Sequence, residues 1–220
     1  MEKPVIGFIG LGLMGGNMAE CLLKNGFKLN VMGRKKEAVA AATALGANEL
    51  NSPKEIAEQS DIVMLCVTTS EVVESLVYGD NGILAGVKEG AVVIDFGTSI
   101  PASTQKIGAD LAAKGVGMID APLGRTPKHA KDGLLNIMAA GDKETFEKVK
   151  PVLDVQGENV FYLGALGSGH VTKLINNFMG MTTACTMSQA FAVADRAGID
   201  RQQLFDICLL YTSPSPRDRG

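Results

Sequence analysis

Three glycines near the start of the chain have the spacing of a phosphate-binding loop. In "VIGFIGLGLMGGNMAE" the pattern G-x-G-x-x-G is formed by Gly10, Gly12 and Gly15, after an apolar run and before a helical pattern. The first glycine of such a loop allows a tight turn, the second lets a pyrophosphate approach the backbone, and the third lets helix and strand pack closely. The N–H groups at the helix start, with Leu13 and Met14, would face the phosphates. We therefore predict a dinucleotide site, with a ligand-free glycine turn as the alternative.

The residues that follow the second expected strand bear on the choice of cofactor. An NAD site usually has Asp or Glu there, bonded to the ribose 2′-hydroxyl. This chain has "VMGRKKEA", in which Gly33 is followed by Arg34, Lys35 and Lys36. A 2′-phosphate would meet cations instead of a carboxylate, which favours NADP. If these residues are only a solvated basic helix start, NAD stays open.

The elements that must position these residues alternate along the chain as far as about residue 164. Strands are expected at 5–9, 29–32, 61–67, 91–96, 118–121, 135–139 and 160–162. Helices are expected at 14–24, 37–45, from Ser52 (as N-cap) onward, and at 70–77, 101–114 and 143–153. This rhythm predicts an α/β fold, a Rossmann-type doubly wound and mainly parallel sheet with helices on both faces.

The character of the sequence changes near Gly164–Gly169, where "GALGSG" supplies a flexible joint. We expect an NAD(P)-binding Rossmann domain at 1–164. A single long helical pattern then runs from about 169 to 197 and should open an all-α substrate and dimerisation domain, of which 165–208 would be the start.

Composition excludes several classes of function. The net charge is −3, without a basic stripe, so no nucleic-acid partner is expected. No apolar stretch approaches the ~20 residues that span a bilayer, so no membrane partner is expected either. The four cysteines are scattered without a C-x-x-C pair, which favours a reducing cytoplasm. His129 and His170 have no carboxylate or cysteine at ligand spacing, so we predict no metal site.

Three segments, in order, carry a resemblance to a known family. They are "GFIGLGLMGGNMA", "DAPLGRTPKHAKDGLLNIMAAGD" (Asp120 to Asp142) and "GSGHVTKLINNFM" (Gly167 to Met179). Over about residues 4 to 208 the chain resembles the β-hydroxyacid dehydrogenases, which include 3-hydroxyisobutyrate dehydrogenase and tartronate semialdehyde reductase. The resemblance implies a reversible, NAD(P)H-dependent reduction of a small aldehyde acid to the hydroxy acid, and a homo-oligomer.

The third segment contains the lysine that the resemblance makes the catalytic acid or base, Lys173, followed by Asn176 and Asn177. Positions i, i+3 and i+4 share one helix face. A lysine there can give a proton to the alkoxide that forms as hydride reaches an aldehyde carbon, and the asparagines can anchor substrate oxygens. The alternative is a polar face of a bundle helix.

The second segment departs from the common family pattern, because most members have Ser-Gly-Gly where this chain has Gly124, Arg125 and Thr126. "GRT" is similar to the sulfolactaldehyde reductase branch, and the loop would hold the acid group of the substrate. Arg125 offers a fork of donors that suits a sulfonate, although a carboxylate would pair with it as well. Reduction of 3-sulfolactaldehyde to 2,3-dihydroxypropane-1-sulfonate or a sulfolactate-type product is the leading expectation. Two other aldehydes are rival substrates: methylmalonate semialdehyde, which corresponds to 3-hydroxyisobutyrate, and tartronate semialdehyde. For Arg125 itself, the alternative to a substrate contact is a surface salt bridge.

Two strand-end residues complete the expected site by resemblance: Thr98 beside the nicotinamide and Val67 beside the adenosine. Both could also be ordinary strand ends. A non-catalytic NADP-binding module, or an inactive fragment, is the rival from another class.

The last residues, "LLYTSPSPRDRG" at 209–220, do not follow the family. Two Ser-Pro pairs and three charged residues cannot continue a helical bundle. We expect the all-α domain to be truncated there and joined to a foreign or disordered tail.

Overall fold

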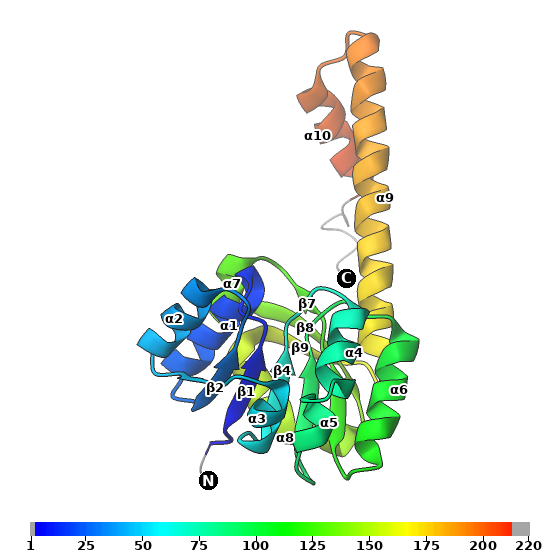
Figure 1. Ribbon diagram of the computed structural model, residues 1–220. Coiled ribbons are helices and arrows are strands. Elements are labelled where there is room, and N and C mark those ends of the chain that lie inside the picture. The colour runs from blue at the N-terminus through cyan, green and yellow to red at the C-terminus, as the bar shows by residue number, and fades with distance from the viewer. Residues whose placement is uncertain (1–2, 213–220) are drawn as a thin grey trace. The chain divides into compact units, whose positions relative to one another are not determined.

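A computed structural model of the chain describes residues 3–212 (Figure 1). The chain divides into two compact units, one that ends at Leu174 and one that begins at Ile175. The domain boundary expected near Gly164–Gly169 stays a prediction.

The first unit contains a nine-stranded sheet in the order β3-β2-β1-β4-β5-β6-β8-β7, with β9 also paired to β8. The strands are β1 (Ile6–Ile9), β2 (Leu29–Met32), β3 (Asn48–Glu49), β4 (Ile62–Leu65), β5 (Val92–Asp95), β6 (Gly117–Asp120), β7 (Leu123–Gly124), β8 (Leu135–Gly141) and β9 (Gly157–Tyr162).

The strands β1 to β6 are all parallel. Ile6 of β1 stands opposite Leu29 of β2 on one side and Ile62 of β4 on the other, so the strand order reverses its direction at β1. The carboxyl ends of these strands therefore meet at one edge of the sheet, beside a topological switch point. The predicted Rossmann-type doubly wound sheet is confirmed.

One side of the sheet differs from the simplest parallel pattern. β8 runs antiparallel to β6 and to the short β7, and β9 returns parallel to β8. The chain reverses at this side because β7 and β8 are joined by the short α7 (Pro127–Lys131) instead of a full crossover helix.

Helices cover both faces of the sheet, and alternate strand residues face them. Phe8 belongs to the core beneath α1 (Leu13–Lys24), α2 (Lys36–Ala44), α7 and α8 (Lys143–Gln156). Ile9 belongs to the core beneath α3 (Pro53–Glu58), α4 (Ser70–Tyr78), α5 (Ile83–Gly86) and α6 (Pro101–Ala112). In Figure 1, α1 and α2 lie on the opposite side of the strands from α4, α5 and α6.

Three of these helices begin at capping side chains of their own. Ser52 accepts a hydrogen bond from the N–H of Glu55 at the start of α3, as predicted for this N-cap. Thr69 and Asp142 do the same for α4 and α8. Local side chains thus satisfy N–H groups that the first turn of a helix leaves unpaired.

The long helix predicted at about 169–197 is present as α9 (Ser168–Arg196), which begins in the first unit and continues into the second. It ends at Arg196 in a Schellman motif, in which Gly198 has a φ of +69° and the N–H of Ile199 donates to the carbonyl of Ala194. The side chains of Phe178 and Met179 on α9 are exposed.

The second unit also contains α10 (Arg201–Thr212). Residues 209–212 of the expected tail lie within this helix, and the rest of that tail lies outside the described residues. None of the helices described between residues 3 and 212 is apolar over a length that could cross a lipid bilayer.

Candidate active site

The glycine loop joins β1 to α1 at the carboxyl edge of the sheet, and each glycine has a different environment. Gly10 has a φ of +102°, and a Cβ there would collide with the carbonyl oxygen of Cys66. A Cβ at Gly15 would collide with the carbonyl oxygen of Gly10, so helix and strand pack closely at this point. A Cβ at Gly12 would meet no atom within 4 Å. The loop is tight on its inner side and open at Gly12, which is the shape that a pyrophosphate requires.

The first turn of α1 faces this opening without a cap of its own. Gly12 is the N-cap residue and makes no side-chain capping bond, and no acid lies in the first turn. Leu13 is 81% exposed, and Met14 is partly buried. The positive end of the helix dipole is therefore available to an anion.

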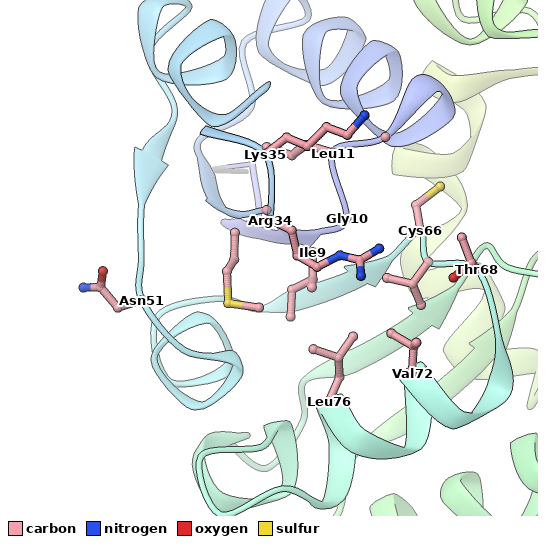
Figure 2. A pocket seen from close by; sticks show the side chains of 14 residues that line it. Ile9, Gly10, Leu11, Arg34, Lys35, Asn51, Cys66, Thr68, Val72 and Leu76 are labelled. Atoms are coloured by element: carbon pink, nitrogen blue, oxygen red, sulfur yellow. The ribbon is translucent and has the colours of Figure 1, made fainter. Parts of the chain in front are cut away.

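A cavity of about 630 Å³ lies next to the glycine loop and extends across the ends of β1, β2 and β4 to α4 (Figure 2). Figure 2 shows the guanidinium of Arg34 pointing into it, whereas the side chain of Lys35 extends along Leu11. Val67, Val72 and other apolar side chains form the opposite wall. An apolar slot with a cation at one end suits the adenosine part of a dinucleotide.

The end of β2 carries no acid in the structure. Gly33 is in contact distance of Leu11 and Val39, and a Cβ on it would stand 3.4 Å and 3.2 Å from their side chains. Arg34 and Lys35 are exposed, and no ion pair with an acid involves either of them within residues 3–212. Both cations are thus available to a ligand.

Cys66 also lines the cavity. Burial raises the pKa of its thiol to about 11, and the nearby carboxylate of Asp95 adds to the rise. The thiol is therefore neutral at ordinary pH, and thiolate chemistry is not expected here.

Val67 is among the residues that line the cavity. Thr98 is exposed and is not one of the lining residues; it lies in the loop after β5. That loop is held by Asp95, whose carboxylate accepts bonds from the N–H of Gly97 (2.8 Å) and the hydroxyl of Ser99 (2.7 Å).

Lys173 lies in the second turn of α9, and its side chain is partly buried. Burial lowers the pKa of its amine. No hydrogen bond or ion pair joins this amine to another side chain in the described part of the chain. Because α9 is helical at these positions, Lys173, Asn176 and Asn177 have the helical spacing that the sequence predicted.

Sequence reasoning missed a buried polar cluster at the start of α9. Asp95 and Asp120 end the neighbouring strands β5 and β6, opposite each other, and both are fully buried. The buried His170 lies between them, with Nε2 3.7 Å from Asp95 Oδ2 and Nδ1 3.8 Å from Asp120 Oδ2. The available signal was an acid at the end of two successive apolar strands, "VVID" and "GMID".

The loop expected to hold the substrate acid has its arginine already engaged. Arg125 adopts a φ of +78°, the left-handed region that favours glycine. Its guanidinium donates to the carbonyl of Leu134 (2.7 Å) and forms an ion pair with Glu158. A role of Arg125 in substrate binding therefore stays a prediction and requires an exchange of partners.

The neighbours of Arg125 are placed as follows. Gly124 belongs to β7 and pairs with Asn136 of β8. The hydroxyl of Thr126 is 2.7 Å from Nδ1 of His129. None of the contacts in the described part of the chain joins the loop at 124–126 to Lys173. The substrate-binding role of this loop therefore rests on the resemblance.

Comparison with known proteins gives consistent results. Residues 5–164 match the family described as the NAD binding domain of 6-phosphogluconate dehydrogenase. The 2-(hydroxymethyl)glutarate dehydrogenase of Eubacterium barkeri is 34% identical over 94% of this chain and 69% of its own length. The 3-sulfolactaldehyde reductase of Escherichia coli (strain K12) is 33% identical over 98% of this chain and 71% of its own.

Among solved structures, the 3-hydroxyisobutyrate dehydrogenase of Mycobacterium tuberculosis with L-serine is similar, with a TM-score of 0.90 and 28% sequence identity. The match covers 97% of this chain and 72% of that one. The similarity therefore extends over both the sheet and most of the helical part that follows it.

Proposed function

Because the chain belongs to the β-hydroxyacid dehydrogenase family and is an NAD(P)-dependent oxidoreductase acting on a CH–OH group, we propose that it interconverts a small aldehyde acid and the corresponding hydroxy acid. Bound NAD(P)H supplies the hydride that reduces the aldehyde carbon. Lys173 donates the proton that converts the aldehyde oxygen to a hydroxyl, and accepts it back in the reverse direction.

The state of the Lys173 amine supports this role most directly. The amine is partly buried, its pKa is lowered by that burial, and no partner in the described chain competes for its protons. A lysine that serves as acid in one direction and base in the other needs a pKa nearer to the working pH than the ordinary value.

The glycine loop and the cavity would hold the cofactor. The first turn of α1, with Gly12, Leu13 and Met14, would bind the pyrophosphate, and the apolar wall that includes Val67 would face the adenine. We propose NADP in preference to NAD, because Arg34 points into the cavity from the end of β2, where no acid stands (Figure 2). Thr98 would approach the nicotinamide.

For the substrate we propose 3-sulfolactaldehyde. The support is the segment Gly124-Arg125-Thr126 and the 33% identity to a 3-sulfolactaldehyde reductase. Addition of a hydride and a proton to this aldehyde gives 2,3-dihydroxypropane-1-sulfonate; sulfolactate would instead need an oxidation. The sulfonate would replace Glu158 at the guanidinium of Arg125. The predicted role of Asn176 and Asn177, which is to hold substrate oxygens, rests on the resemblance alone.

Other small aldehyde acids are alternative substrates under the same proposed reaction. Two of the relatives named above are named for different hydroxy acids and one for a sulfonated aldehyde, yet their identities to this chain lie between 28% and 34%. Identity therefore does not separate 3-sulfolactaldehyde from methylmalonate semialdehyde or tartronate semialdehyde. A homo-oligomer and a cytoplasmic setting likewise stay predictions.

A substrate panel tests the proposal. We would first titrate the chain with NADPH and NADH by nicotinamide fluorescence, then measure the oxidation of each with the three aldehydes. Turnover should disappear in Lys173→Ala while nucleotide binding stays. The control is Lys88→Ala, which removes an exposed lysine elsewhere in the first unit. Retained turnover in Lys173→Ala would refute the role of this lysine.

The rival is a nucleotide-binding module without catalysis. It would bind NADPH as tightly as an active enzyme does and oxidise it with none of the aldehydes, whether or not Lys173 is present. Turnover with any of the three aldehydes that depends on Lys173 excludes this rival.

A further inference from the structure

Helix α9 begins without a capping side chain of its own. The residue that precedes it is Gly167, with a φ of +96°, whereas α3, α4 and α8 begin at Ser52, Thr69 and Asp142. The first N–H groups of α9 must therefore find another acceptor.

Asp120, at the carboxyl end of β6, is that acceptor. Its Oδ1 accepts a hydrogen bond from the N–H of Gly167 at 2.7 Å, and its Oδ2 accepts one from the N–H of His170 at 2.7 Å. A carboxylate in this position also interacts favourably with the positive end of the helix dipole. Gly169 permits the approach, because a Cβ there would stand 2.7 Å from Asp120 Oδ2 and would collide with the carbonyl oxygen of Met138.

His170 holds the same turn from another direction. Its Nδ1 is 3.0 Å from the hydroxyl of Thr104 on α6, and its Nε2 faces Asp95 at 3.7 Å. His170, Thr104, Asp95 and Asp120 are all buried. The first turn of α9 is thus bonded to the end of β6 and to α6, and it lies beside the end of β5.

Lys173 follows His170 by three residues, one turn further along the same helix. We propose that Asp120 is a positioning residue of the reaction: by capping the first turn of α9, it holds the Lys173 amine in its partly buried place at the carboxyl edge of the sheet. The inference rests on the proposed role of Lys173, and it assigns Asp120 no contact with substrate or cofactor.

The variant Asp120→Asn tests this with little change of shape. An amide offers one acceptor oxygen, so one of the two bonds to α9 is lost together with the charge. The readout is acetylation of Lys173 by acetic anhydride as a function of pH, measured by mass spectrometry on the whole chain without nucleotide. The pKa of Lys173 should rise towards the ordinary value as its amine becomes solvated. Amide hydrogen exchange at 168–174 should become about tenfold faster.

The control variant is Asn30→Ala, which also removes buried hydrogen bonds. Asn30 lies on β2 and donates to the carbonyl of Gln59 at 2.9 Å, well away from β6 in the strand order. A merely structural role of Asp120 would lower Tm in both variants and leave the Lys173 titration unchanged in both. A folded Asp120→Asn chain in which Lys173 titrates as in the wild type overturns the proposal.

A second variant covers the case in which Asp120→Asn does not fold. Thr104→Val keeps the shape of the side chain and removes only the hydroxyl that meets His170. It should shift the Lys173 titration in the same direction by a smaller amount, and no shift would overturn the proposal.

Turnover separates this inference from the proposed function. Asp120→Asn should lower kcat roughly 10- to 100-fold and leave the KM for NADPH unchanged. If Lys173→Ala keeps its turnover, the proposed role of Lys173 fails, and the positioning role fails with it. If only the titration and exchange in Asp120→Asn match the wild type, the positioning role fails alone.

Discussion

The amine of Lys173 must hold a proton in one direction of the reaction and release it in the other. Because burial lowers its pKa, we expect the pH–rate profile to change below the range of an ordinary lysine. Oxidation of the hydroxy acid needs the neutral amine, so its rate should rise as the pH rises through this pKa. Reduction of the aldehyde needs the charged amine, so its rate should fall over the same interval. Steady-state rates in both directions, across pH, measure this.

Lys88→Ala should leave the pH at which each of the two rates changes as it is in the wild type. If the rates change only at the pKa of an exposed lysine, or if the same change persists in Lys173→Ala, Lys173 is not the group that exchanges the proton.

Arg34 distinguishes the two cofactors. Its guanidinium lies in the cavity without an acidic partner among the described residues, so Arg34→Ala should weaken NADPH binding about 10- to 100-fold, the value of a lost charge-assisted bond. NADH lacks the 2′-phosphate and should bind nearly as before. Fluorescence titration measures both, with Lys88→Ala, which removes an exposed lysine that does not line the cavity, as the control. Equal weakening for NADPH and NADH would show that Arg34 does not read the phosphate.

Glu158 competes with the substrate for Arg125 if the proposed substrate site is right. The ion pair is partly exposed, and such pairs contribute about 0.2–1 kcal/mol. Glu158→Gln should therefore lower the KM for the aldehyde acid by about two- to fivefold, because the guanidinium becomes available. Arg125→Gly should raise it, although glycine suits the φ of +78° better than arginine does. A KM that neither variant changes would place the substrate acid elsewhere.

At the scale of elements, substitutions at two glycines of the loop should have opposite effects: one should affect stability and the other nucleotide binding. Gly15→Ala should lower the free energy of unfolding by about 1–3 kcal/mol, because the new Cβ collides with the carbonyl oxygen of Gly10. Gly12→Ala should unfold much like the wild type, since a Cβ there meets nothing within 4 Å, but should bind NADPH more weakly because it fills the approach of the pyrophosphate. Thermal unfolding and nucleotide titration of both variants test this. Unimpaired NADPH binding by Gly12→Ala would refute the proposal that the glycine loop binds the pyrophosphate.

The elements that the sequence predicted are those with a local signal. Apolar β-branched runs marked the central parallel strands, and Ser52 before Pro53 marked the start of α3, because both patterns act over a few residues. The short elements β3, α5, β7 and α7 were not predicted, since two to five residues carry too little periodicity. The antiparallel pairing of β8 depends on the tertiary arrangement instead of on any pattern within that strand.

The same distinction applies to the candidate site. The tight and open positions of the glycine loop follow from spacing alone, and the helix confirms the spacing of Lys173, Asn176 and Asn177. The cap of α9 by Asp120 joins residues 47 and 50 positions apart, which a motif does not reveal. The ion-pair partner of Arg125, Glu158, is also outside the motif that contains the arginine, so the sequence left both a substrate contact and a salt bridge open.

At the scale of the whole molecule, every residue that lines the cavity lies between Ile9 and Leu76, within the first unit. A nucleotide that binds only the folded state stabilises it by about 2.7 kcal/mol at 100 times its Kd. For a protein of this size we expect NADPH at that concentration to raise the Tm of the first unit by about 5–10 °C.

Hydrogen exchange locates this stabilisation in the chain. NADPH should slow exchange in the loops at 10–16, 33–36 and 66–72, which surround the cavity, and should leave exchange at 175–212 unchanged. The Gly12→Ala chain is the matched control, because it should fold without this protection. Protection confined to 175–212, or none at a saturating concentration, would mean that the cavity at the end of β1 is not where the nucleotide binds.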